Sequence, residues 1–465
     1  MESNKIRLKT FLNSRVTTIA ICLGLILSNS MAKGQNILDN YINDGLKNNI
    51  VVKEKNLSFD KANYALKEAR TLFLPSVNFI GTYTSGEGGR TIPLPIGDLL
   101  NPVYTTLNKM TQSKSFPQVS NESIGFFPVN FYDAKVRISG PLYDPAISGY
   151  LKIKKDEGQL QEFELLAYKR ELVKDIKTAY FNYLMSMAGV QIYQNATVLI
   201  DKNVSVNKSL LNNGKGLPAS VLRAESEAQS IRSQLLDAQN TMINARHYFN
   251  FLLNRNLDEP IDTSFDKQKA LGSIGMYIGK NKITSREELK MANLGEGIYS
   301  NAYTIYKQFW IPKLSGFVDL GSQASNFVFN SESKYYLVGA QLDFPIFAWG
   351  RNNFKARQFA DDYKTAALNT QYLTTQLQLS SDMAKSNLET TYDRYQTSLK
   401  EATAAQSYFK LIEIGVKEGV NSQIEFIDAR NQLTNSQIAV NINLFKVLQC
   451  MAAVERETAT YTIQK

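Results

Sequence analysis

The sequence predicts an internally duplicated α+β membrane protein, and three observations support this fold class. Similar segments recur about 205 residues apart along the 465-residue chain. Four segments of about ten residues alternate between apolar and polar side chains, as strands with one buried face do. Two proline-free stretches of more than 60 residues predict helices far longer than those of most globular domains. We therefore expect two repeats, each with two strands and a hairpin of long helices.

The N-terminal residues 1–35 have the features of a secretory signal peptide. A basic segment precedes the apolar core 16–27, which is 12 residues long and too short to span a membrane. Small residues before Gln35 suit cleavage close to that position. Cys22 raises the alternative of a lipid anchor, but Ile21 precedes it where a small residue is expected.

Composition argues against several classes of protein. The net charge of +9 falls to +5 once residues 1–35, with five basic residues and one acidic residue, are removed. No block of Lys or Arg predicts nucleic-acid binding. His247 is the only histidine, Cys450 is the only cysteine after the signal, and no glycine-rich phosphate loop is present. We therefore expect no metal, no cofactor, no internal disulfide and no enzymatic activity.

The duplication is anchored by three pairs of matching positions. FLPSVNFIGTYT aligns with WIPKLSGFVDLG, RISGPLYDPAISGYLKIKK aligns with QLDFPIFAWGRNNFKARQF, and two glycine turns align. The matching pairs are Pro75 with Pro312, Pro141 with Pro345, and Gly214 with Gly419. The first pair is 237 residues apart, and the other two pairs are 204 and 205 residues apart. The difference places an insertion at 85–131, which is rich in Pro, Gly and Ser and is expected to be a loop.

Each repeat is expected to contain a helix, two strands, a long helix, a tight turn and a second helix. The first repeat, 36–255, is predicted to contain helix 36–72, strands 73–84 and 132–142, long helix 146–212, turn 213–218 and helix 219–255. The second repeat, 284–458, is predicted to contain helix 285–310, strands 311–322 and 334–345, long helix 348–414, turn 415–421 and helix 422–458. Segment 256–283 links the repeats, and 459–465 is a tail. Ser285 and Glu288 match a capping box at the start of the second repeat.

The strands have the pattern of membrane strands. After residue 35 no apolar run reaches 18 residues, so a segment that crosses a membrane would have to belong to a β-barrel. Alternate residues place an apolar face opposite a more polar face. Aromatic residues near the strand ends predict an interfacial girdle, and they are Tyr83, Phe131, Tyr132, Phe327, Tyr335 and Tyr336. A soluble antiparallel sheet would give the same alternation, so this alternative stays open.

The long helices predict coiled-coil packing. Leucines and small residues recur at intervals of three and four along 373–399, as in a coiled-coil seam. Gly214 and Gly419 occupy positions where a left-handed residue ends a helix, and Pro218 suits the first turn of the returning helix. A solvated fibrous bundle would have the same pattern.

Four strands cannot close a barrel, and an open sheet edge in lipid leaves backbone groups unpaired. If the strands lie in a membrane, the barrel must be shared between chains. Three chains would supply twelve strands, and the long helices of three chains would form an α-helical barrel next to it.

The chain resembles the TolC family of outer-membrane efflux channels, in particular its members from Bacteroidota. The residues that carry the resemblance are the duplicated pattern, the corners SGPLYDPAISGY and DFPIFAWGRNNF, and the motif EGVNSQIEFIDARNQL. The resemblance covers about 37–457. It implies a homotrimer in outer-membrane lipid, with a helical barrel in the periplasm. It also implies a periplasmic adaptor protein and an inner-membrane pump such as an RND or ABC transporter.

The resemblance also implies a site at the periplasmic end. Glu425 and Asp428 match two acids that line the closed entrance in the family, so three chains would place six carboxylates at one mouth. The tip turns that match are Gly214, Gly216, Pro218, Gly419, Asn421 and Ser422. The Arg–Asp pair that latches the entrance in the family's best-known member corresponds here to Asn421 and Ser220, which carry no charge. A periplasmic or surface-anchored coiled-coil scaffold without a pore remains the alternative function.

Overall fold

The structure, a computed structural model, describes residues 37–127, 129–279 and 286–463. The predicted signal peptide and Ser285 of the predicted capping box lie outside the described residues. The chain divides into two compact units. We call Ala62–Glu157 with Gly297–Lys364 the sheet unit, and the remaining residues the helical unit.

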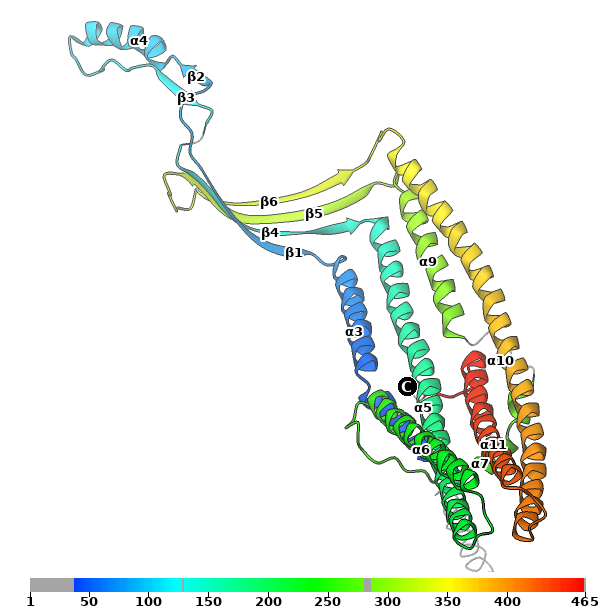
Figure 1. The fold of residues 1–465 in the computed structure, drawn as a ribbon. Helices are drawn as coiled ribbons and strands as arrows, with labels where there is room; N and C mark the ends of the chain where they lie inside the picture. Colours follow the sequence, from blue (N-terminus) through cyan, green and yellow to red (C-terminus); the bar gives the residue numbers. More distant parts are fainter. Residues whose placement is uncertain (1–36, 128, 280–285, 464–465) are drawn as a thin grey trace, which may run out of the picture. The chain divides into compact units, whose positions relative to one another are not determined.

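The sheet unit contains a four-stranded antiparallel sheet (Figure 1). Its strands are β1 (Ser76–Thr84), β4 (Phe131–Tyr143), β5 (Lys313–Ser325) and β6 (Lys334–Asp343), and they lie in that order. Each repeat supplies one hairpin, and β4 pairs with β5 to join the repeats. The predicted strands are confirmed, with ends that differ by at most three residues. Among the described residues, β1 and β6 each pair on one side only.

The sequence suggested that the insertion between β1 and β4 is a loop, but the insertion forms two strands and a helix. It contains β2 (Thr91–Leu94), helix α4 (Ile96–Thr111) and β3 (Glu122–Gly125), with β2 and β3 paired (Figure 1). Pro102 lies inside α4, although proline usually interrupts a helix. Asparagine side chains of α4 bind the segment that returns from α4 to β3. The Pro and Gly content concealed the helical spacing of the apolar residues.

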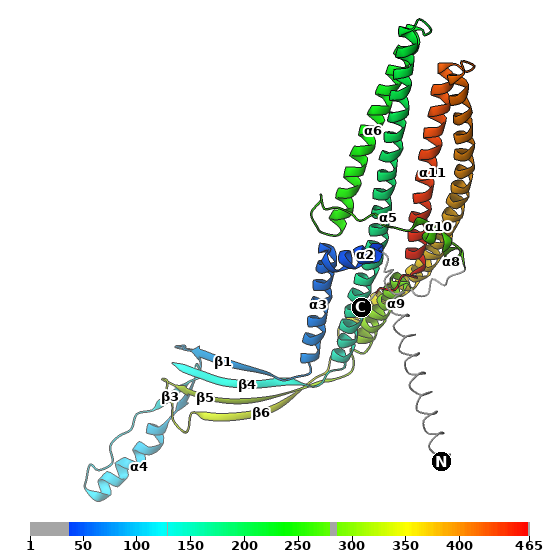
Figure 2. The same ribbon diagram turned by 90° about the horizontal axis from the view of Figure 1, so that it is seen from below.

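The helical unit consists mainly of two helix hairpins, each beginning with a long helix whose first turns belong to the sheet unit (Figure 2). One consists of α5 (Pro145–Asn212) and α6 (Pro218–Leu252), and the other of α10 (Arg351–Lys417) and α11 (Gln423–Thr458). An aromatic core joins them: Tyr180 and Phe249 have ring centroids 5.6 Å apart, and both side chains are fully buried, as is Phe445 of α11. A second core lies near one turn, where the ring centroids of Phe409 and Phe426 are 5.5 Å apart.

The predicted helix 36–72 is two helices, α2 (Ile37–Asn48) and α3 (Ile50–Thr71). Asn49 separates them. Its side-chain oxygen accepts hydrogen bonds from the backbone N–H groups of Val51 and Val52, and its amide donates to the carbonyl of Leu252 at 2.9 Å. Asn49 therefore caps α3 and fixes the break against the end of α6.

The link between the repeats also contains helices. The link has α7 (Lys267–Gly272) and α8 (Gly275–Ile278), and α9 (Glu287–Lys307) is the first helix of the second repeat. Asp266 caps α7 by accepting from the backbone N–H of Lys269 at 3.0 Å. Phe265 packs against Tyr180 and Phe181, so this part of the link lies on the helical core.

Helix α11 is long and apolar enough by composition to cross a membrane. The sequence analysis predicted no such helix, because charged and polar residues interrupt every apolar run. Its side chains Phe445, Val447 and Leu448 are buried in the core of the helical unit. We therefore interpret α11 as a core helix.

Candidate functional site

The four-stranded sheet has one apolar face and one polar face. Residues that lie directly opposite one another across the strands form continuous apolar rows, which are Val77–Ile138–Val318–Val338 and Phe79–Val136–Leu320–Tyr336. All of these side chains except the half-buried Val318 are exposed in the single chain, with 74% of Phe79 and 78% of Tyr336 accessible. A band of this kind is stable only when lipid or protein covers it.

The opposite face carries a charged network that joins the two repeats. Arg137 of β4 lies directly opposite Asp319 of β5 and donates two hydrogen bonds to its carboxylate, at 2.7 and 2.6 Å. Lys135 contacts Asp133 at 2.7 Å, and the hydroxyl of Tyr335 donates to Asp133 at the same distance. The network pairs both cations with carboxylates, so this face is polar with balanced charge at these positions.

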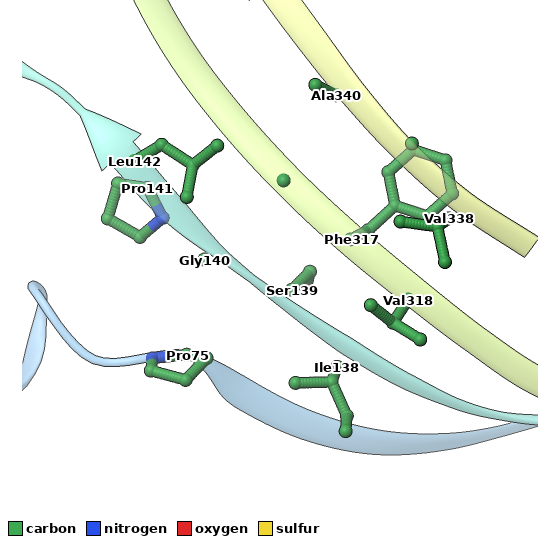
Figure 3. Close-up of a pocket in the computed structure, with 12 residues that line it drawn as sticks. Pro75, Ile138, Ser139, Gly140, Pro141, Leu142, Phe317, Val318, Val338 and Ala340 are labelled. Carbon is green, nitrogen blue, oxygen red and sulfur yellow. The ribbon is translucent and has the colours of Figure 1, made fainter.

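An apolar hollow of about 560 Å³ lies on the sheet near the ends of the strands that lead into helices (Figure 3). Gly140, Gly316 and Ala340 lie directly opposite one another and line it, together with Ile138 and Val318. Small side chains leave the space, and branched aliphatic side chains surround it. Its apolar lining is compatible with acyl chains.

Predicted girdle residues gather at the hairpin ends of the strands, but they divide between the two faces. Phe327 stacks on Tyr83 and Tyr132, with ring centroids 5.5 and 5.9 Å apart. Tyr132 is buried under these rings and contacts Ser322. Tyr336 lies in the apolar band, whereas Tyr335 and Phe131 lie in register on the charged face. The girdle assignment is therefore corrected for Tyr335 and Phe131, because neighbouring residues of a strand point to opposite faces.

Aromatic residues also lie at the other ends of the strands, and they were not predicted. The chain has two tryptophans, and both lie there. Trp310 precedes β5 and Trp349 follows β6, and they are 61% and 85% exposed. Phe347 packs against Trp349 with ring centroids 4.8 Å apart. Tryptophan beside a strand end is typical of a membrane–water interface, and this preference could have identified both residues from the sequence.

The two predicted glycine turns end their helices by the same hydrogen-bond pattern. Gly214 and Gly419 have φ values of +67° and +75°, in the left-handed region. The N–H of Lys215 donates to the carbonyl of Leu210, and the N–H of Val420 donates to the carbonyl of Gly415. Each turn is thus a Schellman motif. The first long helix ends at Asn212 as predicted, whereas α10 ends at Lys417, three residues beyond the predicted end at 414. Pro218 is the first residue of α6, which therefore begins one residue before the predicted start at 219.

Small residues also close the turns. Backbone atoms of Leu210 and Leu211 lie where a Cβ on Gly216 would be placed, and the amide of Asn421 occupies the corresponding space beside Gly415. Asn421 therefore packs within its own turn.

Glu425 has a local structural role that the sequence analysis did not assign to it. Its carboxylate accepts a 2.6 Å hydrogen bond from the backbone N–H of Ser422, and the hydroxyl of Ser422 accepts from the N–H of Glu425. This capping box begins α11. The hydrogen bonds from the backbone and side chain of Ser422, and then from Asn421, lower the pKa of Glu425. The pattern Ser422–Gln–Ile–Glu425 could have indicated the cap.

Glu425 and Asp428 remain available at the surface of the single chain. Both residues are exposed, while the intervening Phe426 and Ile427 are buried. The structure therefore places the two carboxylates on the exposed side of the first turns of α11. Because the pKa of Glu425 is lowered, its carboxylate is ionised at neutral pH.

Two contacts between the hairpins lie close to these turns and were not predicted. Arg430 of α11 is fully buried and contacts Glu227 of α6 at 2.5 Å. The amides of Asn203 in α5 and Gln423 in α11 hydrogen-bond to each other. Burial lowers the pKa of Arg430, and the charge of Glu227 opposes this effect. These contacts hold α11 against the first hairpin. They do not involve Ser220, the position that corresponds to the Asp of the latch.

Comparisons with known proteins place the chain in a class. A family model described as outer membrane efflux protein matches residues 41–255 and 282–453. A comparison with curated proteins gives no match. Solved structures with the same fold include the outer-membrane channel OprN, with 15% identity, a TM-score of 0.73, and coverage of 91% of this chain and 89% of that one.

Two further channels have similar values. The CmeC outer membrane channel of Campylobacter jejuni has 13% identity and a TM-score of 0.72, with 91% and 85% of the two chains covered. The MtrE outer membrane channel of Neisseria gonorrhoeae, solved in its open state, has 14% identity and a TM-score of 0.72, with 90% and 88% covered. These likenesses establish the fold, which is that of outer-membrane channels. The chain belongs to the outer membrane efflux protein family, which confirms the predicted resemblance and the outer-membrane location.

Proposed function

We propose that this protein is the exit duct of a tripartite efflux or secretion system. It conducts substrates passively across the outer membrane, which they reach from an inner-membrane pump of the RND or ABC class through a periplasmic adaptor. The observation that carries the proposal is the sheet with one apolar face, one charged face and two unpaired edges. In this role the protein is a channel and catalyses no reaction.

The unpaired edges support a homotrimer. β1 has a free edge on one side of the sheet and β6 has a free edge on the other, among the described strands. Pairing β1 of one chain with β6 of the next closes the sheet without leaving backbone groups exposed to lipid. Three copies give twelve strands, and the charged face with Arg137 and Asp319 then lines the lumen.

A periplasmic scaffold without a pore fits the structure less well. A scaffold that stays in water would expose the rows that contain Phe79 and Tyr336, together with Trp310 and Trp349. Exposed apolar surface of this extent marks a surface that lipid or another protein covers.

We further propose that Glu425 and Asp428 form the acidic ring of the periplasmic entrance. Both residues are exposed and share the first turns of α11. Six carboxylates around a narrow mouth would attract cations and repel one another. The buried contact of Arg430 with Glu227 is the interaction that we propose in place of an Arg–Asp latch.

Conductance of the purified protein in planar bilayers tests the proposal. Stable channels with a cation preference are expected for the wild type. Glu425→Gln with Asp428→Asn should reduce that preference, because it removes both carboxylates while Gln can still accept from the N–H of Ser422. Glu418→Gln, an exposed acid in the turn that follows α10, is the control and should change the cation preference less. If the double substitution leaves the ion selectivity unchanged, Glu425 and Asp428 do not form an acidic ring at the entrance. If the folded protein forms no channels, the proposal that it is an exit duct is contradicted.

A further inference from the structure

Helix α4 of the insertion has an apolar face that the described residues leave largely uncovered. Ile96, Val103 and Met110 are spaced seven residues apart, and Leu99, Leu100 and Leu107 lie beside them on the same side of the helix. The side chains of Val103 and Met110 are 52% and 77% exposed. The face is a continuous apolar stripe, which is unusual for a helix surrounded by water.

The opposite face of α4 is fixed to the returning segment 113–121. The side chain of Asn101 donates to the carbonyl of Val119 at 2.9 Å and accepts from its N–H at 2.8 Å. Asn108 makes the same pair of hydrogen bonds to Phe116, at 2.7 and 3.0 Å. The returning segment therefore covers the polar face and leaves the apolar face free.

The insertion is thus an ordered element and not a collapsed loop. Asn121 accepts from the N–H of Asp98 at 3.1 Å and donates to its carboxylate at 3.0 Å. The rings of Tyr104 and Phe116 pack with centroids 5.7 Å apart. The carbonyl of Val119 lies so close to Gly97 that no side chain fits there. These contacts hold the returning segment in place, so the apolar stripe has a defined geometry.

We propose that the apolar stripe of α4 packs against α4 of the other copies of this chain, so that the three insertions form a small helix bundle. The seven-residue spacing is the pattern of helices that pack against one another. The insertion begins directly after β1, whose free edge meets a neighbouring copy in the proposed function, so the new contact continues that interface. The inference rests on the proposed trimer.

The short length of α4 favours a second copy over an unrelated partner. A helix of 16 residues offers too little surface for strong binding between separate molecules. Copies held together by a shared barrel meet at a high effective concentration, so the same small surface is sufficient. A lipid surface or another protein is an alternative occupant, and the experiment distinguishes them.

Cysteine cross-linking tests the proposal. Cys450→Ser removes the only cysteine that follows the predicted signal. Val103→Cys and Met110→Cys are then introduced singly, with Lys109→Cys as the matched control, because Lys109 is exposed and lies about 100° around the helix from Met110. The mass of each purified complex is measured first. A result other than three chains contradicts the proposed trimer itself, and not only the proposed packing of the α4 helices.

In intact trimers, mild oxidation should link chains through position 103 or 110 at least ten times more than through position 109. Before oxidation, maleimide should label positions 103 and 110 at least ten times more slowly than position 109. Trimers that form no links at 103 and 110 and label there as fast as at 109 would overturn the proposal and leave the stripe free for another protein. Quenching of a fluorophore at position 110 by a brominated phospholipid in liposomes would also overturn it and assign the stripe to lipid.

Discussion

The ion network where α9 begins and α11 ends leads to a quantitative prediction. Arg286 is buried, with 2% of its side chain exposed, and it contacts Glu288 at 2.9 Å and Glu457 at 2.6 Å. Arg456 also contacts Glu288 at 2.9 Å. Burial by itself would raise the pKa of Glu288, but hydrogen bonds from Arg286 and the backbone, with the charges of Arg286 and Arg456, lower it to about 2.

The lowered pKa corresponds to a definite contribution to stability. The pKa falls from 4.5 to about 2, and each pH unit is worth about 1.4 kcal/mol, so ionised Glu288 stabilises the fold by about 3 kcal/mol at neutral pH. Because the folded-state pKa is the lower one, this stabilisation is complete above pH 4.5. It is lost as the pH falls from 4.5 towards 2.

Glu288→Gln should remove this stabilisation, which can be measured by amide hydrogen exchange of the detergent-purified protein. A loss of about 3 kcal/mol corresponds to roughly 100-fold faster exchange at the start of α9 and the end of α11 at pH 7. Glu296→Gln in the same helix is the control and should change exchange less than threefold. Unchanged protection in Glu288→Gln, or wild-type protection that is constant from pH 5 to pH 2.5 after correction for intrinsic rates, would refute the reasoning.

Three further predictions concern the turns and the sheet. Gly419→Ala should destabilise its turn by about 1 kcal/mol, because a side chain disfavours the left-handed conformation, and proteolysis at the turn should become faster. Arg430→Met should speed amide exchange in α6 and α11, and combining it with Glu227→Gln should restore part of the protection, because the unpaired carboxylate is then also removed. Asp319→Asn should leave Arg137 without its carboxylate and lower the cation preference of the channel, as measured by reversal potentials.

The parts of the fold that depend on local pattern could be predicted from the sequence. The faces of β6 follow from its alternation, and the ends of α5 and α10 follow from Gly214 and Gly419, because only the nearest residues determine them. The division of 36–72 at Asn49 could not be predicted, since it depends on the carbonyl of Leu252, which is 203 residues away.

The candidate site divides in the same way. The acids Glu425 and Asp428 could be selected from the sequence, but the capping role of Glu425 was overlooked although Ser422 has the required spacing. Arg137 and Asp319 are 182 residues apart in the sequence, and they pair only because β4 and β5 adopt a particular register. No local pattern in the sequence specifies that register. In α4 the composition was misleading, because prolines and glycines suggested a loop while the spacing of the apolar residues indicated a helix.

The central claim is that the sheet of one chain closes only with the sheets of two others in the outer membrane. The most direct test is the mass of the detergent-purified complex by native mass spectrometry. The account predicts three chains in every complex, because β1 and β6 each have a free edge among the described strands. A stable, folded single chain would contradict it, because its sheet would then keep both edges unpaired.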